Sequence, residues 1–105
     1  MTLREKQSEF ALAVAQLILW AHHEGYEVTF GHATRCPECP VGSPSSLHKS
    51  RLAIDLNLFR NGHYLKTTED HRPLGEFWES LGGAWGGRFS NPDGNHYSFP
   101  HDGRM

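Results

Sequence analysis

The stretch Ser46–Phe59, SLHKSRLAIDLNLF, places a carboxylate inside a segment that otherwise has the pattern of a β-strand. Asp55 lies between apolar residues, and His48 precedes it by seven positions. A carboxylate buried in such a segment is costly unless it is paired, hydrogen-bonded or bound to a metal ion. We therefore expect a partner for Asp55 elsewhere in the chain.

His96, in the segment Asp93-Gly94-Asn95-His96, is the candidate third member of a site with His48 and Asp55. Two imidazoles and one carboxylate are a suitable ligand set for a catalytic zinc ion, with the fourth position left to water. Such a site keeps a net positive charge, which lowers the pKa of the bound water towards ~7. The spacing alone also fits a surface His/Asp pair, so both interpretations remain open at this point.

The elements that would position these residues begin with an amphipathic helix over roughly residues 3–24. Thr2 to Glu5 fits a capping box, and Gly25 fits a helix end. Apolar residues recur between them at helical spacing: Phe10, Val14, Leu17, Ile18 and Ala21. We expect this helix to be core scaffold.

A small antiparallel sheet is predicted beside that helix. Residues 26–30 and 52–59 alternate and are rich in strand-forming residues. Asn61-Gly62 is a strong hairpin signal and predicts a return strand over 63–65. One face of the strand 52–59 is entirely aliphatic and must be core, so a metal or substrate site would lie on the opposite face, with Asp55.

A short second helix over 74–81, with Pro73 near its start, and a last strand over 96–99 complete the expected elements. Residues 35–46 hold three prolines, a glycine and three serines, which predicts an irregular loop. The expected fold class is therefore α+β, a small antiparallel sheet with flanking helices.

The composition describes one small globular domain. The 105 residues suit a single domain over 1–105 with one modest core. A hydrophobic fraction of 37% excludes a disordered chain, and a net charge of −2 gives no general basic surface for nucleic acid. The N-terminus does not resemble a signal peptide and no segment approaches membrane-spanning length, so we expect synthesis in the cytoplasm and no direct membrane insertion.

Cys36 and Cys39 form the one CxxC motif. A full structural zinc site needs a second pair, which the sequence lacks, although a mixed site with His32 is conceivable. A redox motif needs a helix start beside it, and Pro40 argues against one. We expect two free or loosely paired thiols, and a CxxC-based nucleic-acid or redox module is the least favoured function.

Several segments together resemble the signature of the M15 family of zinc peptidases, which is SxHxxGxAxD, then a WGG segment far downstream, then [DE]xxH. The likeness spans about residues 26–99. The matching segments are Ser46-Leu47-His48, Ala53-Ile54-Asp55, Ala84-Trp85-Gly86-Gly87-Arg88-Phe89 and Asp93-Gly94-Asn95-His96-Tyr97. The resemblance implies a hedgehog/DD-peptidase-like single domain, and the compact chain looks most like the family's small bacteriophage endolysins.

The resemblance also implies roles for individual residues. His48, Asp55 and His96 would be the zinc ligands. Asp93 would be the general base or acid that acts on the metal-bound water. Arg35 would stabilise the developing oxyanion or hold a substrate carboxylate.

Three further residues follow from the same comparison. Ser46 would hydrogen-bond near the site. Trp85 would form a wall of the substrate groove, with a structural turn packed by an aromatic side chain as the equal alternative. Arg51 stands where the family has glycine, so the turn after His48 differs or adopts an ordinary conformation. The other histidines with no nameable partner, expected at the surface, are His22, His23, His71 and His101.

The expected function is that of a zinc-dependent peptidase that cuts stem-peptide bonds of bacterial peptidoglycan by a metal-activated water. The L-alanyl-D-glutamate bond is favoured because the chain is as compact as the phage endopeptidases. The alternatives are a D-Ala-D-Ala carboxypeptidase or dipeptidase and a non-catalytic zinc-binding module. Asp93 favours an enzyme over the binding module.

The setting of such an enzyme follows by analogy with phage endolysins. We expect a monomer whose catalytic domain uses the whole chain, without a wall-binding module. It would be made in the host cytoplasm and act in the periplasm or cell wall. Because the substrate lies beyond the membrane, we also expect a holin-like pore as the route of release.

Overall fold

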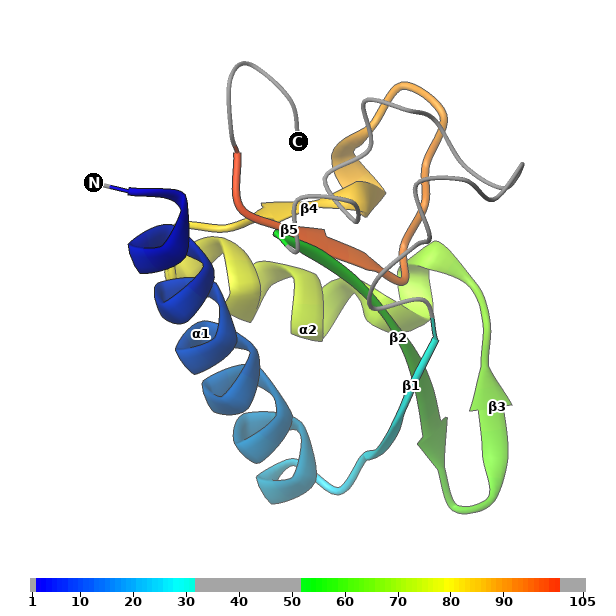
Figure 1. The fold of residues 1–105 in the computed structure, drawn as a ribbon. Coiled ribbons are helices and arrows are strands. Elements are labelled where there is room, and N and C mark those ends of the chain that lie inside the picture. Colours follow the sequence, from blue (N-terminus) through cyan, green and yellow to red (C-terminus); the bar gives the residue numbers. More distant parts are fainter. Residues whose placement is uncertain (1, 32–51, 101–105) are drawn as a thin grey trace.

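The structure is a computed structural model that describes residues 2–31 and 52–100. Over these residues two α-helices lie against a five-stranded antiparallel sheet, which confirms the α+β class (Figure 1). The elements, in chain order, are α1 (Leu3–His23), β1 (Glu27–Phe30), β2 (Ala53–Arg60), β3 (His63–Leu65), α2 (Thr68–Ser80), β4 (Ala84–Trp85), the 3₁₀-helix η1 (Gly86–Arg88) and β5 (His96–Ser98). Neither described α-helix is long and apolar enough to cross a bilayer.

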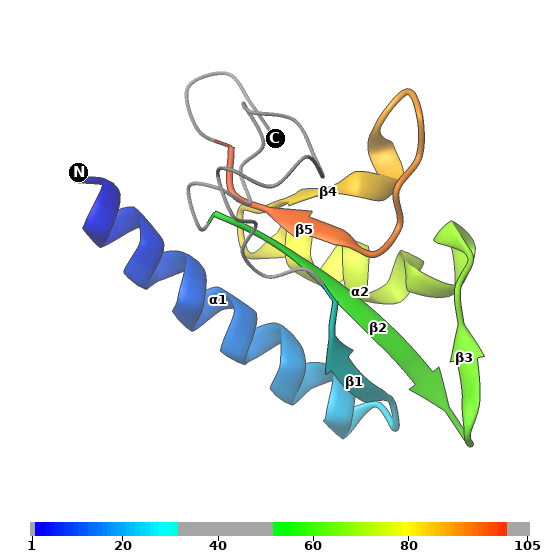
Figure 2. The same cartoon turned by 45° about the vertical axis from the view of Figure 1, so that its right-hand side comes forward.

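β2 is the strand around which the sheet assembles. It pairs with β1 over residues 56–59, with β3 over 58–60 and with β5 over 53–55, and β4 adds to the far edge of β5. Both cartoon views show the β2–β3 turn at the end of the molecule away from β4 and β5 (Figure 2). The second half of β2 therefore forms the hairpin with β3, and the first half carries Asp55.

The predicted helix and hairpin are confirmed to within a residue or two at each end. Thr2 caps α1 through the expected capping box with Glu5, and Gly25 follows the helix at φ 91°. Asn61 and Gly62 have φ of 53° and 78°, the positive values that a type I′ hairpin turn requires.

The core lies between the helices and one face of the sheet. The aliphatic side chains of the strand, Leu52, Ile54, Leu56 and Leu58, are buried as predicted. α1 packs against β1 and α2, while α2 packs against β4 and η1. The helices thus form one layer, and α2 supports the short strands next to the candidate site.

The second helix is longer than the sequence predicts, because its start lies at Thr68 and not at Leu74. Thr67 forms a capping box with Asp70: its hydroxyl oxygen accepts from the Asp70 N–H at 3.1 Å, and the Asp70 carboxylate accepts from the Thr67 N–H at 3.4 Å. Pro73 therefore lies inside the helix and does not mark its first turn. The Thr67 cap, and not Pro73, sets the start of α2.

His71 is also placed differently from its prediction, since it is 2% exposed and not at the surface. Its Nε2 lies 3.1 Å from the Leu65 carbonyl oxygen, and its Nδ1 lies 2.8 Å from the Tyr97 hydroxyl. The carbonyl can only accept, so Nε2 carries the proton and Nδ1 accepts from Tyr97. Burial lowers the pKa of His71 and favours this neutral form.

We expect His71 to make the fold less stable in mild acid. Its pKa is lower in the folded chain, so its contribution is fully present above the unfolded pKa of about 6.5 and is lost as the pH falls through the folded pKa. His71→Gln, which cannot titrate there, should lose less stability between about pH 7.5 and about pH 5. Urea unfolding of both proteins across this range measures the difference, and equal pH slopes would contradict the assignment.

Candidate functional site

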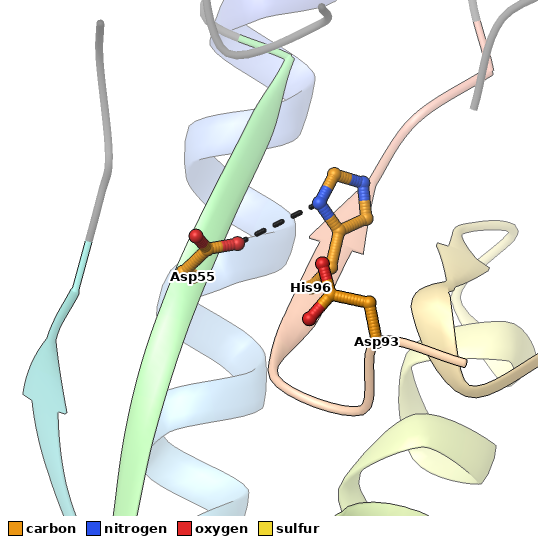
Figure 3. A group of neighbouring side chains, drawn as sticks. All are labelled: Asp55, Asp93 and His96. Carbon is orange, nitrogen blue, oxygen red and sulfur yellow. Dashed lines mark ion pairs between the residues drawn. The ribbon is translucent and has the colours of Figure 1, made fainter. Parts of the chain in front are cut away.

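Three side chains meet where β2 pairs with β5 (Figure 3). Asp55 and His96 are register partners, and His96 Nδ1 lies 3.6 Å from Asp55 Oδ1. Asp93 reaches the same place from the loop before β5, and one possible ligand atom from each of the three residues lies within 4.8 Å of the others. Asp55 and His96 are each 7% exposed, whereas Asp93 is exposed.

Strand pairing alone brings Asp55 and His96 together. Residues directly opposite in an antiparallel pair have Cβ atoms about 4.5–5.5 Å apart and point to the same face. The pairing is continued beyond β5 by the Leu56 N–H, which donates to the Asn95 carbonyl at 3.0 Å. On the other side of β2 the Gly31 N–H donates to the Asp55 carbonyl at 2.8 Å. The backbone of Asp55 is therefore held from both edges.

The loop that carries Asp93 is fixed by hydrogen bonds to β4 and η1. The Asp93 N–H donates to the Gly86 carbonyl at 2.9 Å, and the Trp85 indole N–H donates to the Gly94 carbonyl at 2.7 Å. The His96 N–H donates to the Asp93 carbonyl at 3.1 Å and closes the turn. These three bonds set the position of Asp93 relative to His96.

Gly86 makes this arrangement sterically possible. A Cβ at Gly86 would lie 2.1 Å from the Asp93 carbonyl oxygen and 2.7 Å from the His96 Cβ. Both distances are far inside van der Waals contact, so any side chain there would push the site loop away. The first glycine of the WGG segment is therefore a spacer that lets η1 touch the loop.

Gly94 is needed for close packing and not for a left-handed backbone, because its φ is not positive. A Cβ at this position would lie 2.5 Å from the Thr68 Cα. Glycine is needed here because the start of α2 lies directly against the loop.

The structure gives Trp85 a structural role. Its side chain is 1% exposed, so it offers almost no surface to a substrate. The indole packs so tightly on α2 that a Cβ at Gly75 would lie 2.1 Å from the ring. The structure supports the turn packed by an aromatic side chain. Trp85 also lines a pocket at the β4 edge, so its role as a wall of the substrate groove stays a prediction.

Asp55 and His96 are positioned to bind one cation together. Two ligands bound to one zinc ion at about 2.0–2.2 Å in tetrahedral geometry lie roughly 3.4 Å apart. The 3.6 Å between His96 Nδ1 and Asp55 Oδ1 is close to that separation and long for a direct hydrogen bond. Carboxylate oxygen and imidazole nitrogen are also the ligand types that zinc accepts.

Several predicted site residues lie outside the described residues, and their roles stay predictions. They are Arg35, Ser46 and His48, together with Cys36, Cys39 and Arg51. Conversely, sequence patterns do not single out Phe89, whose ring centroid lies 5.3 Å from that of His96. Phe89 belongs to the AWGGRF segment, but only the fold shows which ring it meets.

A family sequence profile and a solved protein structure are similar to this chain. The sequence profile of an M15 peptidase family described as D-alanyl-D-alanine carboxypeptidase matches residues 41–99, which is more than half of the chain. The crystal structure of the Serratia marcescens L-Ala D-Glu endopeptidase ChiX has a similar fold, with a TM-score of 0.64 over 92% of this chain and 85% of that one. The two sequences are 14% identical, so this likeness concerns the fold alone. No curated protein sequence matches the chain.

We expect Gly86→Ala to weaken metal binding about ten- to a hundredfold, because the added methyl group displaces the loop that carries Asp93 and pushes against His96 of β5. Zinc titration calorimetry measures the affinity, and a urea unfolding curve checks that the variant is folded. Asn91→Ala, an exposed position in the same loop, is the control and should bind as the parent does. A Gly86→Ala protein with unchanged zinc affinity would show that the spacer role is wrong.

Proposed function

Because the chain belongs to the M15 peptidase family, whose profile covers Asp55, Asp93 and His96, we propose that it is a zinc-dependent peptidase of bacterial peptidoglycan. The observation that carries the proposal is the convergence of these three side chains within 4.8 Å at the β2–β5 junction. A surface His/Asp pair would have no need of burial, whereas Asp55 and His96 are almost fully enclosed.

We propose His48, Asp55 and His96 as the zinc ligands and Asp93 as the group that moves protons. The 3.6 Å separation of the Asp55 and His96 donor atoms supports their joint ligation. His48 follows from the family pattern, in which the first histidine precedes the aspartate by seven residues. The exposure of Asp93 supports its role in proton transfer, since a proton carrier must contact both water and substrate.

Hydrolysis of a peptide bond needs a nucleophilic water and a protonated leaving amine. Zinc, when bound, supplies acidity to water and polarises the scissile carbonyl. Asp93 would accept the proton from the attacking water and deliver it to the amine. Arg35 is proposed to stabilise the negative charge that develops on the carbonyl oxygen. The bond from the Asp93 N–H to the Gly86 carbonyl and the bond from the Trp85 indole to the Gly94 carbonyl hold the loop of Asp93 in place before substrate arrives.

The bond that we propose as the substrate is L-alanyl-D-glutamate. The fold likeness to an L-Ala D-Glu endopeptidase supports this choice, while the description of the family profile favours the D-alanyl-D-alanine bond as the alternative. We also propose the setting of a phage endolysin, made in the host cytoplasm and released to the wall through a holin-like pore.

Digestion of purified peptidoglycan followed by mass spectrometry of the fragments tests the function. The proposal predicts that L-alanine stays on the glycan while a peptide beginning with D-glutamate is released. Loss of a single terminal D-alanine would identify the alternative bond. Undigested peptidoglycan, with the protein zinc-loaded and folded, would contradict a wall peptidase of either kind.

We expect Asp93→Ala to keep the fold and the zinc but to lose roughly 10²- to 10⁴-fold in rate, the usual contribution of a positioned acid or base. His96→Ala is the comparison variant and should lose the zinc as well as the activity. Metal analysis and peptide hydrolysis on the same preparations separate the two effects. Zinc-loaded Asp93→Ala that cuts at nearly the parent rate would exclude the proton role, and loss of zinc from this variant would make Asp93 a ligand.

A further inference from the structure

A pocket of about 270 Å³ lies at the β4 edge of the sheet, beside the candidate site. Its lining includes Glu79 of α2, Ala84 and Trp85 of β4, Arg88 of η1, and Phe89 and Pro100. Phe89 also contacts the site, because its ring centroid lies 5.3 Å from that of His96. The pocket and the candidate metal centre therefore share one aromatic wall.

The register of the sheet places Ala84, one of the residues that line the pocket, on the same face as His96, whereas Trp85 lines it from the opposite face. Side chains alternate along a strand, so His96 and Ser98 point to one face of β5 and Tyr97 to the other. Ala84 is the partner of Ser98 in β4 and therefore points to the face that carries His96. A peptide that runs from the site past Phe89 to the β4 edge would meet the pocket.

The rim of the pocket carries a fixed guanidinium group. Arg88 donates to Glu79 through two parallel bonds, Nε to Oε2 at 3.0 Å and Nη2 to Oε1 at 3.1 Å. Glu79 belongs to α2, so this pair ties η1 to the helix and restricts the arginine side chain. Nη1 is not used in the pair, and the Arg88 side chain is 48% exposed, so a ligand can reach it. A carboxylate is the acceptor that best matches the guanidinium N–H groups that Glu79 leaves unused.

We propose that this pocket binds the residue that follows the scissile bond, with its short aliphatic part against Ala84, Phe89 and Pro100 and its carboxylate on Arg88. The inference rests on the proposed function. Both candidate bonds provide such a residue. D-Glutamate has methylene groups and a free carboxylate, and a terminal D-alanine has a methyl group and a carboxylate. The pocket is smaller than the ~300–1,000 Å³ typical of sites for drug-sized ligands, which suits one residue and not a whole stem peptide.

The position of Asp93 agrees with this assignment. The residue that follows the bond carries the leaving amine, which must receive a proton from Asp93 in the proposed mechanism. Gly86, the first residue of η1, accepts the hydrogen bond from the Asp93 N–H at 2.9 Å, and Arg88 ends the same short helix. One three-residue element therefore connects the proton carrier with the proposed carboxylate site.

The test uses two synthetic stem peptides that differ in one group. The carboxylate of the residue after the scissile bond is free in the first and converted to a primary amide in the second. Arg88→Gln should lower kcat/KM for the carboxylate peptide about tenfold, a value at the weak end for a charged hydrogen bond because Arg88 is half exposed. The effect should appear mainly in KM, and the rate on the amide peptide should stay within about twofold of the parent.

Arg72→Gln is the matched control. Arg72 also forms an ion pair with a glutamate of α2, at 2.7 Å from Glu69, and lies 5.8 Å from the Trp85 ring, but it does not line the pocket. This variant should leave both peptides unaffected. Arg88→Lys keeps the positive charge but lacks the paired N–H donors of a guanidinium group. Its kcat/KM on the carboxylate peptide should lie between those of the parent and of Arg88→Gln.

Two results would overturn the inference while leaving the proposed function intact: equal losses on the two peptides after Arg88→Gln, and no loss on either. A parent enzyme that cuts neither peptide would instead overturn the proposed function, and this inference with it. A tenfold loss confined to the carboxylate peptide, absent in Arg72→Gln, is the result that we predict.

Discussion

The antiparallel pairing of Asp55 with His96 is the constraint on which the candidate site depends. Each side chain comes from a strand whose register is fixed by backbone hydrogen bonds, so neither has to be placed by a flexible loop. A slip of one residue in β5 would turn His96 to the opposite face and put Tyr97 beside Asp55. The geometry of the site therefore depends on the register of β5, a strand of three residues.

Strands as short as β4 and β5 need support from outside the sheet. Trp78 of α2 supplies it, since its indole N–H donates to the Ser98 carbonyl at 3.0 Å and lies 3.2 Å from the Ala84 carbonyl. The Tyr97 hydroxyl is held by His71 of the same helix. Burial raises the pKa of Tyr97, so its hydroxyl keeps the proton that this bond requires. α2 thus fixes the register on which the pairing of Asp55 and His96 rests.

The sequence predicts those features that depend on neighbouring residues. The capping box of α1, the Asn61-Gly62 turn and the alternation of β2 are local signals, and the structure contains all three. The burial of His71 could not be predicted in this way, because its partners Leu65 and Tyr97 are brought to it by the fold. The need for glycine at position 94 also depends on the fold, because Thr68 lies against it only after α2 has docked.

The most direct test of the account is the location of zinc by anomalous diffraction from crystals of the zinc-loaded protein. We expect one peak within about 2.0–2.2 Å of both a carboxylate oxygen of Asp55 and an imidazole nitrogen of His96. Asp93 should lie beside this peak without binding it. A zinc ion held by Cys36 and Cys39, with none between Asp55 and His96, would contradict the account.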